Sequence, residues 1–143
     1  MLNIKSIVNY LPYRHPFLFI DRILKIKYGK YVHTIKNISY NDFFFKGHFH
    51  NNPVFPGVLI IESIAQAAGL LVYENNKKLK IKELYYLAKI EHAIFKSIVH
   101  PGDQLFIKVK LKKKIRNIVK FIGFASVNEK IVCTTKIICA KKK

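Results

Sequence analysis

The residues best suited to acid–base chemistry lie close together in the sequence, between Gly47 and Gln66. His48 stands in a segment rich in glycine, asparagine and proline, which predicts an irregular loop. A neutral imidazole titrates near neutral pH and therefore suits the role of a general base. Glu62 stands among aliphatic residues, where removal from water raises the pKa of a carboxyl and favours its protonated form. The stretch thus combines a candidate base with a candidate acid.

A third chemical function is predicted at Gly57. Pro56 and Gly57 begin a predicted helix, and the free N–H groups at a helix N-terminus favour developing negative charge. Gln66 follows Glu62 by one helical turn and shares its helix face. Removing water from a β-hydroxyacyl compound needs a base for the α-proton, an acid for the leaving hydroxyl and donors that polarise the carbonyl. His48, Glu62 and the N–H groups at Gly57 match these requirements in that order.

Each of these residues also has an ordinary structural interpretation. A single buried glutamate is most often held by a structural partner, and a loop histidine is most often structural or solvated. His48 and His50 resemble half of a metal site, but no third ligand stands at a suitable spacing, so no metal and no other cofactor is expected. The aromatic runs Phe43–Phe45 and Tyr85–Tyr86 favour packing over recognition.

One helix is strongly predicted. It begins at Pro56 and Gly57, runs from Val58 to Tyr73 and ends at residues 74–76. It is apolar on nearly every face, which is typical of a helix buried on all sides. Small residues such as Ala65 and Gly69 allow close packing against it.

The remaining pattern predicts a sheet. Short connections make neighbouring strands antiparallel, and a short helix over residues 3–10, a turn at residues 28–30 and a loop over residues 41–56 complete the chain. The strand-like segments are Phe17–Ile26, Tyr31–Ile38, Leu84–Phe95, Gln104–Lys112, Ile118–Asn128 and Ile131–Ala140. With 143 residues and no linker, the chain is expected to form one α+β domain over residues 1–143, in which a mostly antiparallel sheet wraps one buried helix.

The chain is strongly basic, with 26 Lys and Arg against 8 acidic residues and a net charge of +18. Nucleic-acid binding is the first alternative that such a charge raises. The lysines are spread along the sequence, however, and no aromatic residues alternate with arginine on one face, which argues against it. Two explanations of the positive charge remain. One is AT-rich codon usage, which the abundance of Lys, Ile and Asn indicates, and the other is an acidic partner. We expect the tail Lys141–Lys143 to be disordered.

Localisation follows from the apolar segments and the cysteines. The N-terminal residues lack the apolar run of a signal peptide, and the segment Val58–Tyr73 is too short for a membrane span and contains Glu62. Cys133 and Cys139 cannot form a disulfide framework and are expected to be buried thiols in a reducing compartment. The sequence therefore predicts a cytoplasmic protein without membrane insertion.

Several motifs, in order along nearly the whole chain, resemble the (3R)-hydroxyacyl-[acyl carrier protein] dehydratases of type II fatty acid synthesis. The central signature comprises Gly47-His48-Phe49, Pro53–Leu59, Glu62 and Ala65-Gln66. The flanking blocks that also match are Leu11–Arg22, Lys36–Ile38, Ile90–Phe95 and Val99–Leu105.

The resemblance implies a hotdog fold, dimers whose sheets join, and commonly three such dimers in a hexamer. It implies a site that pairs His48 of one subunit with Glu62 of the other, and Glu at this position is similar to the broad-range dehydratase, whose substrates include 3-hydroxyacyl precursors of lipid A. Phe55, Val58, Gly57 and Gln66 are the expected substrate-binding residues. The resemblance also implies an acidic acyl carrier protein as the partner, and Lys46 and Lys96 are expected to lie where it docks.

The chain departs from the family pattern at three points. His50 replaces a usual proline, Phe55 stands where Met is frequent, and Tyr13 and His15 exchange the usual histidine and aromatic positions. None of these changes removes a required group. A thioesterase on the same fold is the second hypothesis, and release of a free acid with a free carrier thiol would distinguish it.

Overall fold

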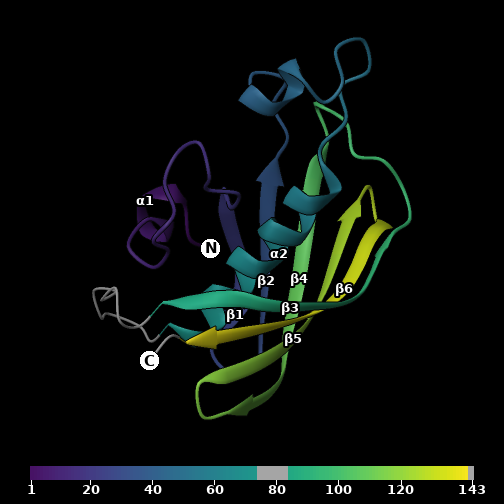
Figure 1. The fold of residues 1–143 in the computed structure, drawn as a ribbon. Coiled ribbons are helices and arrows are strands. Elements are labelled where there is room, and N and C mark those ends of the chain that lie inside the picture. The colour runs from purple at the N-terminus through teal and green to yellow at the C-terminus, as the bar shows by residue number, and fades with distance from the viewer. Residues whose placement is uncertain (74–83, 142–143) are drawn as a thin grey trace.

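The structure, a computed structural model, describes residues 1–73 and 84–141. A six-stranded antiparallel sheet in the order β1-β2-β4-β5-β6-β3 curves around the helix α2, Gly57–Val72 (Figure 1). The strands are β1 Arg22–Lys27, β2 Tyr31–Asn37, β3 Tyr85–Phe95, β4 Gln104–Ile115, β5 Ile118–Val127 and β6 Lys130–Lys141. The predicted α+β architecture with one main helix is confirmed.

The helix α2 forms most of one side of the core. Its buried residues include Ile60, Ile64 and Leu71, and it packs against β2, β3, β4, β5 and β6. It lies close to the sheet at Gly123 in β5, where an added Cβ would overlap Cγ2 of Ile64. The absence of a side chain at position 123 therefore allows this close approach. The predicted helix end at residues 74–76 lies outside the described residues.

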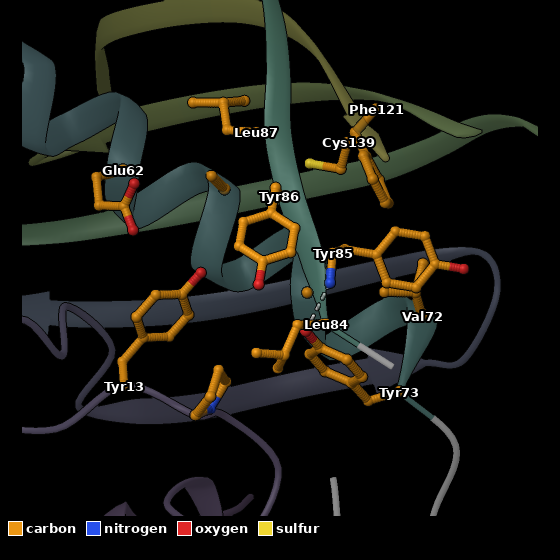
Figure 2. A pocket seen from close by; sticks show the side chains of 13 residues that line it. Tyr13, Glu62, Val72, Tyr73, Leu84, Tyr85, Tyr86, Leu87, Phe121 and Cys139 are labelled. Atoms are coloured by element: carbon orange, nitrogen blue, oxygen red, sulfur yellow. Dashed lines mark hydrogen bonds between the residues drawn. The ribbon is translucent and has the colours of Figure 1, made fainter. Parts of the chain in front are cut away.

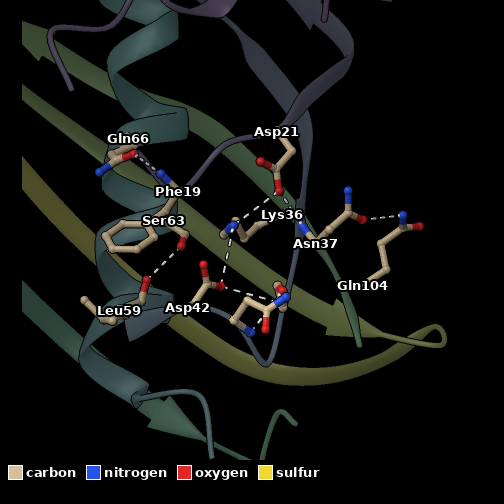
Figure 3. Close-up of polar contacts among 11 residues, drawn as sticks. Phe19, Asp21, Lys36, Asn37, Asp42, Leu59, Ser63, Gln66 and Gln104 are labelled. Atoms are coloured by element: carbon tan, nitrogen blue, oxygen red, sulfur yellow. Dashed lines mark hydrogen bonds and ion pairs between the residues drawn. The ribbon is translucent and has the colours of Figure 1, made fainter. Parts of the chain in front are cut away.

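The segment Phe17–Asp21 was predicted as the start of a strand, which is wrong, because β1 begins at Arg22. The reason is a side chain from α2. The amide of Gln66 accepts from Phe19 N (2.8 Å), as Figure 3 shows, and donates to Phe17 O (2.8 Å). This backbone therefore pairs with the helix. Hydrogen bonding to the sheet begins at Asp21, whose N–H donates to Ile35 O (2.8 Å).

Other element bounds differ at their ends. The N-terminal helix α1 spans only Ile4–Ile7, with Asn3 accepting from Lys5 N (3.1 Å), and a 3-10 helix, η1 (Phe43–Lys46), interrupts the predicted loop. Lys141, predicted within a disordered tail, instead ends β6, because it pairs with Tyr85 and its N–H donates to Asn117 O (2.8 Å). Residues 142–143 lie outside the described part of the chain.

Lysines gather on the outer face of the sheet. His33 in β2 faces Lys25 on β1 and Lys108 on β4 across the strands. The pKa of His33 lies below its ordinary value, first because of burial and then because of the positive charges of Lys108, Lys25 and Lys110. Like charges therefore lie close together on this face, where water and salt screen them.

Both cysteines are buried, as predicted. Burial raises the pKa of Cys133 to about 11 and that of Cys139 to about 12, so both are neutral thiols at neutral pH. No helix in the described ranges is long and apolar enough to cross a bilayer.

Candidate active site

Glu62 lines a cavity of about 270 Å³ between α2, β3 and the N-terminal segment (Figure 2). Its carboxyl is half-buried, and Oε1 accepts a hydrogen bond from Nε2 of Gln66 (3.0 Å). Burial raises the pKa of Glu62 above its ordinary value, while the hydrogen bond from Gln66 opposes this rise. The carboxyl therefore retains its proton to a higher pH than a solvated glutamate, as the sequence predicts.

Gln66 acts on Glu62 rather than on the cavity. Its side chain is fully buried, and its amide is engaged by Phe17, Phe19 and Glu62. The amide orientation is fixed by this arrangement, because the backbone N–H of Phe19 can only donate and the carbonyl of Phe17 can only accept. Gln66 thus holds the Glu62 carboxyl in one position.

His48 is held by its own loop. Its carbonyl accepts from Val54 N (2.9 Å), and its ring nitrogen Nδ1 lies 2.7 Å from Val54 O. Since a carbonyl can only accept, Nδ1 carries the proton of the neutral ring and Nε2 carries the free electron pair. The ring also stacks on Phe49, with centroids 4.0 Å apart. The loop therefore leaves Nε2 as the basic nitrogen.

Gly57 stands at the N-terminus of α2 beside a second cavity of about 370 Å³. The first hydrogen bonds of the helix are those from Leu59 and Ile60 to Pro56 O, so the N–H groups of Gly57 and Val58 lie outside the helical pattern. An added Cβ at Gly57 would lie 2.8 Å from the Phe95 ring. The Phe95 ring therefore lies beside the helix end, and a side chain at position 57 would have to displace it.

Three of the predicted substrate-binding residues, Phe55, Gly57 and Val58, line this second cavity together. Phe55 is 1% exposed and packs against other phenylalanines, whereas Val58 is 71% exposed. Neither cavity is lined by His48, and the two cavities share no lining residue. Within one chain the structure brings Glu62 to Gln66, but it does not bring His48 to the cavity of Glu62.

Two tyrosines near Glu62 escaped the sequence analysis. Tyr13 and Tyr86 line the Glu62 cavity, and Figure 2 shows the Tyr13 hydroxyl on the side of Glu62. Burial, and next the charge of Glu62, raise the pKa of Tyr13 well above its usual range. Tyr13 could have been noticed because Tyr13 and His15 exchange the usual histidine and aromatic positions of the family pattern. Tyr86 was missed because it belongs to the run Tyr85–Tyr86, which was assigned to packing.

Comparisons with known proteins identify the family. Residues 11–136 match the FabA-like domain family. The chain is 52% identical over 141 residues to a protein of Buchnera aphidicola subsp. Acyrthosiphon pisum (strain Tuc7) named 3-hydroxyacyl-[acyl-carrier-protein] dehydratase FabZ, covering 99% of this chain and 93% of that protein. A protein of the same name from Blochmanniella pennsylvanica is 46% identical over 143 residues, covering 100% and 95%.

Solved structures share the fold at low identity. The dehydratase heterocomplex ApeI:P from Xenorhabdus doucetiae superposes with a TM-score of 0.81 at 18% identity, covering 96% of this chain and 91% of that chain. A hypothetical thioesterase protein with coenzyme A from Streptococcus pneumoniae superposes with a TM-score of 0.64 at 13% identity, covering 85% and 84%. These likenesses concern the hotdog fold alone.

Proposed function

Because the chain belongs to the FabA-like family and is a 3-hydroxyacyl-[acyl-carrier-protein] dehydratase of fatty acid biosynthesis, we propose that His48 and Glu62 carry out the dehydration. Nε2 of His48 takes the α-proton, and the electron pair of that C–H bond forms the double bond to the β-carbon. The C–O bond at the β-carbon breaks, and Glu62 gives its proton to the leaving hydroxyl, which departs as water. The product is the trans-2-enoyl thioester.

The two residues are prepared for these roles in different ways. The contact with Val54 O leaves a free electron pair on Nε2 of His48. Burial raises the pKa of Glu62, so its carboxyl holds a proton to a higher pH than a solvated glutamate does. The N–H groups at Gly57 are suited to polarise the thioester carbonyl, because they lie at the positive end of the α2 dipole.

The single observation that carries this proposal is the position of β3. This strand is one edge of the sheet, and within the described part of the chain it pairs with β6 alone. Its exposed apolar side chains are Tyr86, Leu87, Ile90, Ile94 and Phe95. A long, apolar, unpaired edge is a template for pairing with another chain. We therefore infer a homodimer in which two copies of β3 join the two sheets.

Such a dimer would complete the active site. Tyr86, near the start of β3, lines the Glu62 cavity, and Phe95, at its end, lines the Gly57 cavity. In an antiparallel pair the start of one strand lies beside the end of the other. The Glu62 cavity of one copy would thus meet the helix N-terminus and the His48 loop of the second copy.

The reaction itself is tested with purified protein and a (3R)-3-hydroxyacyl thioester of acyl carrier protein. We expect the carrier-bound chain to lose the mass of one water while the thioester remains intact. Added chelator should leave the rate unchanged. A free carrier thiol with free fatty acid would instead identify a thioesterase.

The basic surface near the site gives a second prediction. Lys46 ends η1 just before His48, and Lys96 follows Phe95; both are exposed. If they meet an acidic carrier, kcat/KM for the carrier-bound substrate falls as salt rises, whereas a short thioester without carrier is unaffected. Lys46→Glu or Lys96→Glu should lower kcat/KM for the carrier-bound substrate about 3- to 10-fold.

The matched control is Lys110→Glu, which makes the same charge change on the outer face of the sheet. If Lys110→Glu lowers kcat/KM for the carrier-bound substrate as much, or if both substrates respond equally to salt, the net charge reflects composition and has no role in docking.

A further inference from the structure

Lys36 is a buried cation near the end of β2. Side chains of a strand alternate between its two faces, so Lys36 shares the inner face with the fully buried Val32 and Thr34. An ammonium group is costly to bury unless acidic groups pair with it. Two carboxylates do so, because Nζ lies 3.4 Å from Oδ2 of Asp21 and 4.0 Å from Oδ2 of Asp42 (Figure 3). Lys36 thus joins a segment that precedes β1 to a segment that follows β2.

The first of these segments leads to Glu62. Asp21 stands two residues after Phe19, whose N–H donates to Oε1 of Gln66 (2.8 Å). Gln66 in turn donates to Oε1 of Glu62 (3.0 Å). The carboxyl of Asp21 also accepts from Asn37 N (2.7 Å), so this segment is held by β2 on one side and by α2 on the other. The position of Asp21 is therefore transmitted to the acid of the proposed reaction through Gln66.

The second segment leads to His48. Asp42 is the residue directly before η1, and its carboxyl accepts from Ser39 N (3.3 Å). At the other end of η1, His48 N donates to Phe44 O (3.0 Å), so the histidine is attached to this short helix. The ion pair with Lys36 therefore fixes the start of the helix that carries the base of the proposed reaction.

The sheet gives Lys36 a firm base. In the next residue, Oδ1 of Asn37 accepts from Nε2 of Gln104 at the start of β4 (2.8 Å). The N–H of Ile38 then donates to Asp103 O (3.0 Å). The end of β2 is thus anchored to the neighbouring strand immediately after Lys36, so the ammonium group can serve as a fixed point for the two irregular segments.

We propose that Lys36 is a positioning residue that holds the Glu62 acid and the His48 base in place through Asp21 and Asp42. This inference rests on the proposed function, which assigns the two catalytic roles. In the proposed dimer His48 and Glu62 of one chain belong to different sites, so one lysine orients one group in each site. A misplacement of about 1 Å can lower a rate about 100-fold, so Lys36 acts on the chemical step without touching the substrate.

The first test measures kinetics with a short 3-hydroxyacyl thioester that lacks the carrier, so that docking does not contribute. Lys36→Met keeps the length of the side chain and removes its charge. It should lower kcat by about 10- to 100-fold and change KM by less than about twofold. Lys36→Arg keeps the charge and should retain most of the activity. As a control, Lys108→Met removes one positive charge from the outer face of the sheet and should have little effect.

Amide hydrogen exchange gives a readout that needs no turnover. In Lys36→Met, exchange should become faster at residues 17–21 and 43–48 while β5 stays protected. Asp21→Asn should affect only the first segment, and Asp42→Asn only the second. Neither should lower kcat further in the Lys36→Met background, because the ion pairs are already lost. Faster exchange in β5 as well would indicate a general loss of stability and contradict a positioning role.

Unchanged kcat in folded Lys36→Met would overturn the proposal. If that variant does not fold, Asp21→Asn and Asp42→Asn take its place, and unchanged kcat in both would overturn it equally. Inactive His48→Ala and Glu62→Gln beside a fully active Lys36→Met would contradict this inference alone. Active His48→Ala and Glu62→Gln would remove the catalytic roles, whereas faster exchange in both segments of Lys36→Met would still support their coupling through this lysine.

Discussion

His48→Ala and Glu62→Gln are each expected to lower kcat by about 100- to 10,000-fold while the protein remains folded. The first change removes the only nitrogen that can accept the α-proton in the proposed reaction. The second keeps the shape of the side chain but removes the acidic proton. Steady-state dehydration of a 3-hydroxyacyl carrier protein measures both losses, and circular dichroism checks the fold.

His50→Ala is the matched control for the histidine, because His50 is an exposed residue of the same loop. It should retain most of the activity. The pH profile adds a test for Glu62, since activity should fall as pH rises through the elevated pKa of this carboxyl. Full activity in either His48→Ala or Glu62→Gln would remove that residue from the mechanism.

Mixing the two inactive variants should restore activity. If each site takes His48 from one subunit and Glu62 from the other, a hybrid dimer contains one intact site and one site that lacks both groups. Random exchange makes half of the dimers hybrid, so an equal mixture should recover about a quarter of the unmodified activity. The measurement is kcat after subunit exchange, which is brought about by mild denaturant and dilution.

The control for this experiment is the double variant His48→Ala/Glu62→Gln, which should rescue neither single variant. Differently tagged subunits, captured together, establish that exchange has occurred. Exchange without any recovered activity would mean that each site lies within one chain, and the role of β3 in completing the site would then be wrong.

Sequence reasoning was most accurate where one element explained a long pattern. The helix α2 was predicted almost to the residue, and the contact of Gln66 with Glu62 followed from helical spacing. It failed at Phe17–Asp21, because residues that suit a strand are held by a side chain far along the sequence. Propensity describes neighbours in the chain and does not anticipate such tertiary hydrogen bonds.

The order of strands was also hidden. Six strands could be recognised from alternation and turns, but nothing in β3 itself states that it lies at the edge. The structure exposes most of its side chains. A further cavity, lined by Gly29, Tyr73 and Leu111 among others, was hidden for a similar reason, because these residues meet only in three dimensions.

The close approach of α2 to β5 limits the order in which this sequence can change over generations. Alanine at Gly123 overlaps Ile64, so that substitution is harmful alone and tolerable only after position 64 has lost its Cγ2. Substitutions at exposed positions can therefore accumulate one at a time. At this helix–sheet contact two substitutions are needed, and the one at Ile64 has to come first.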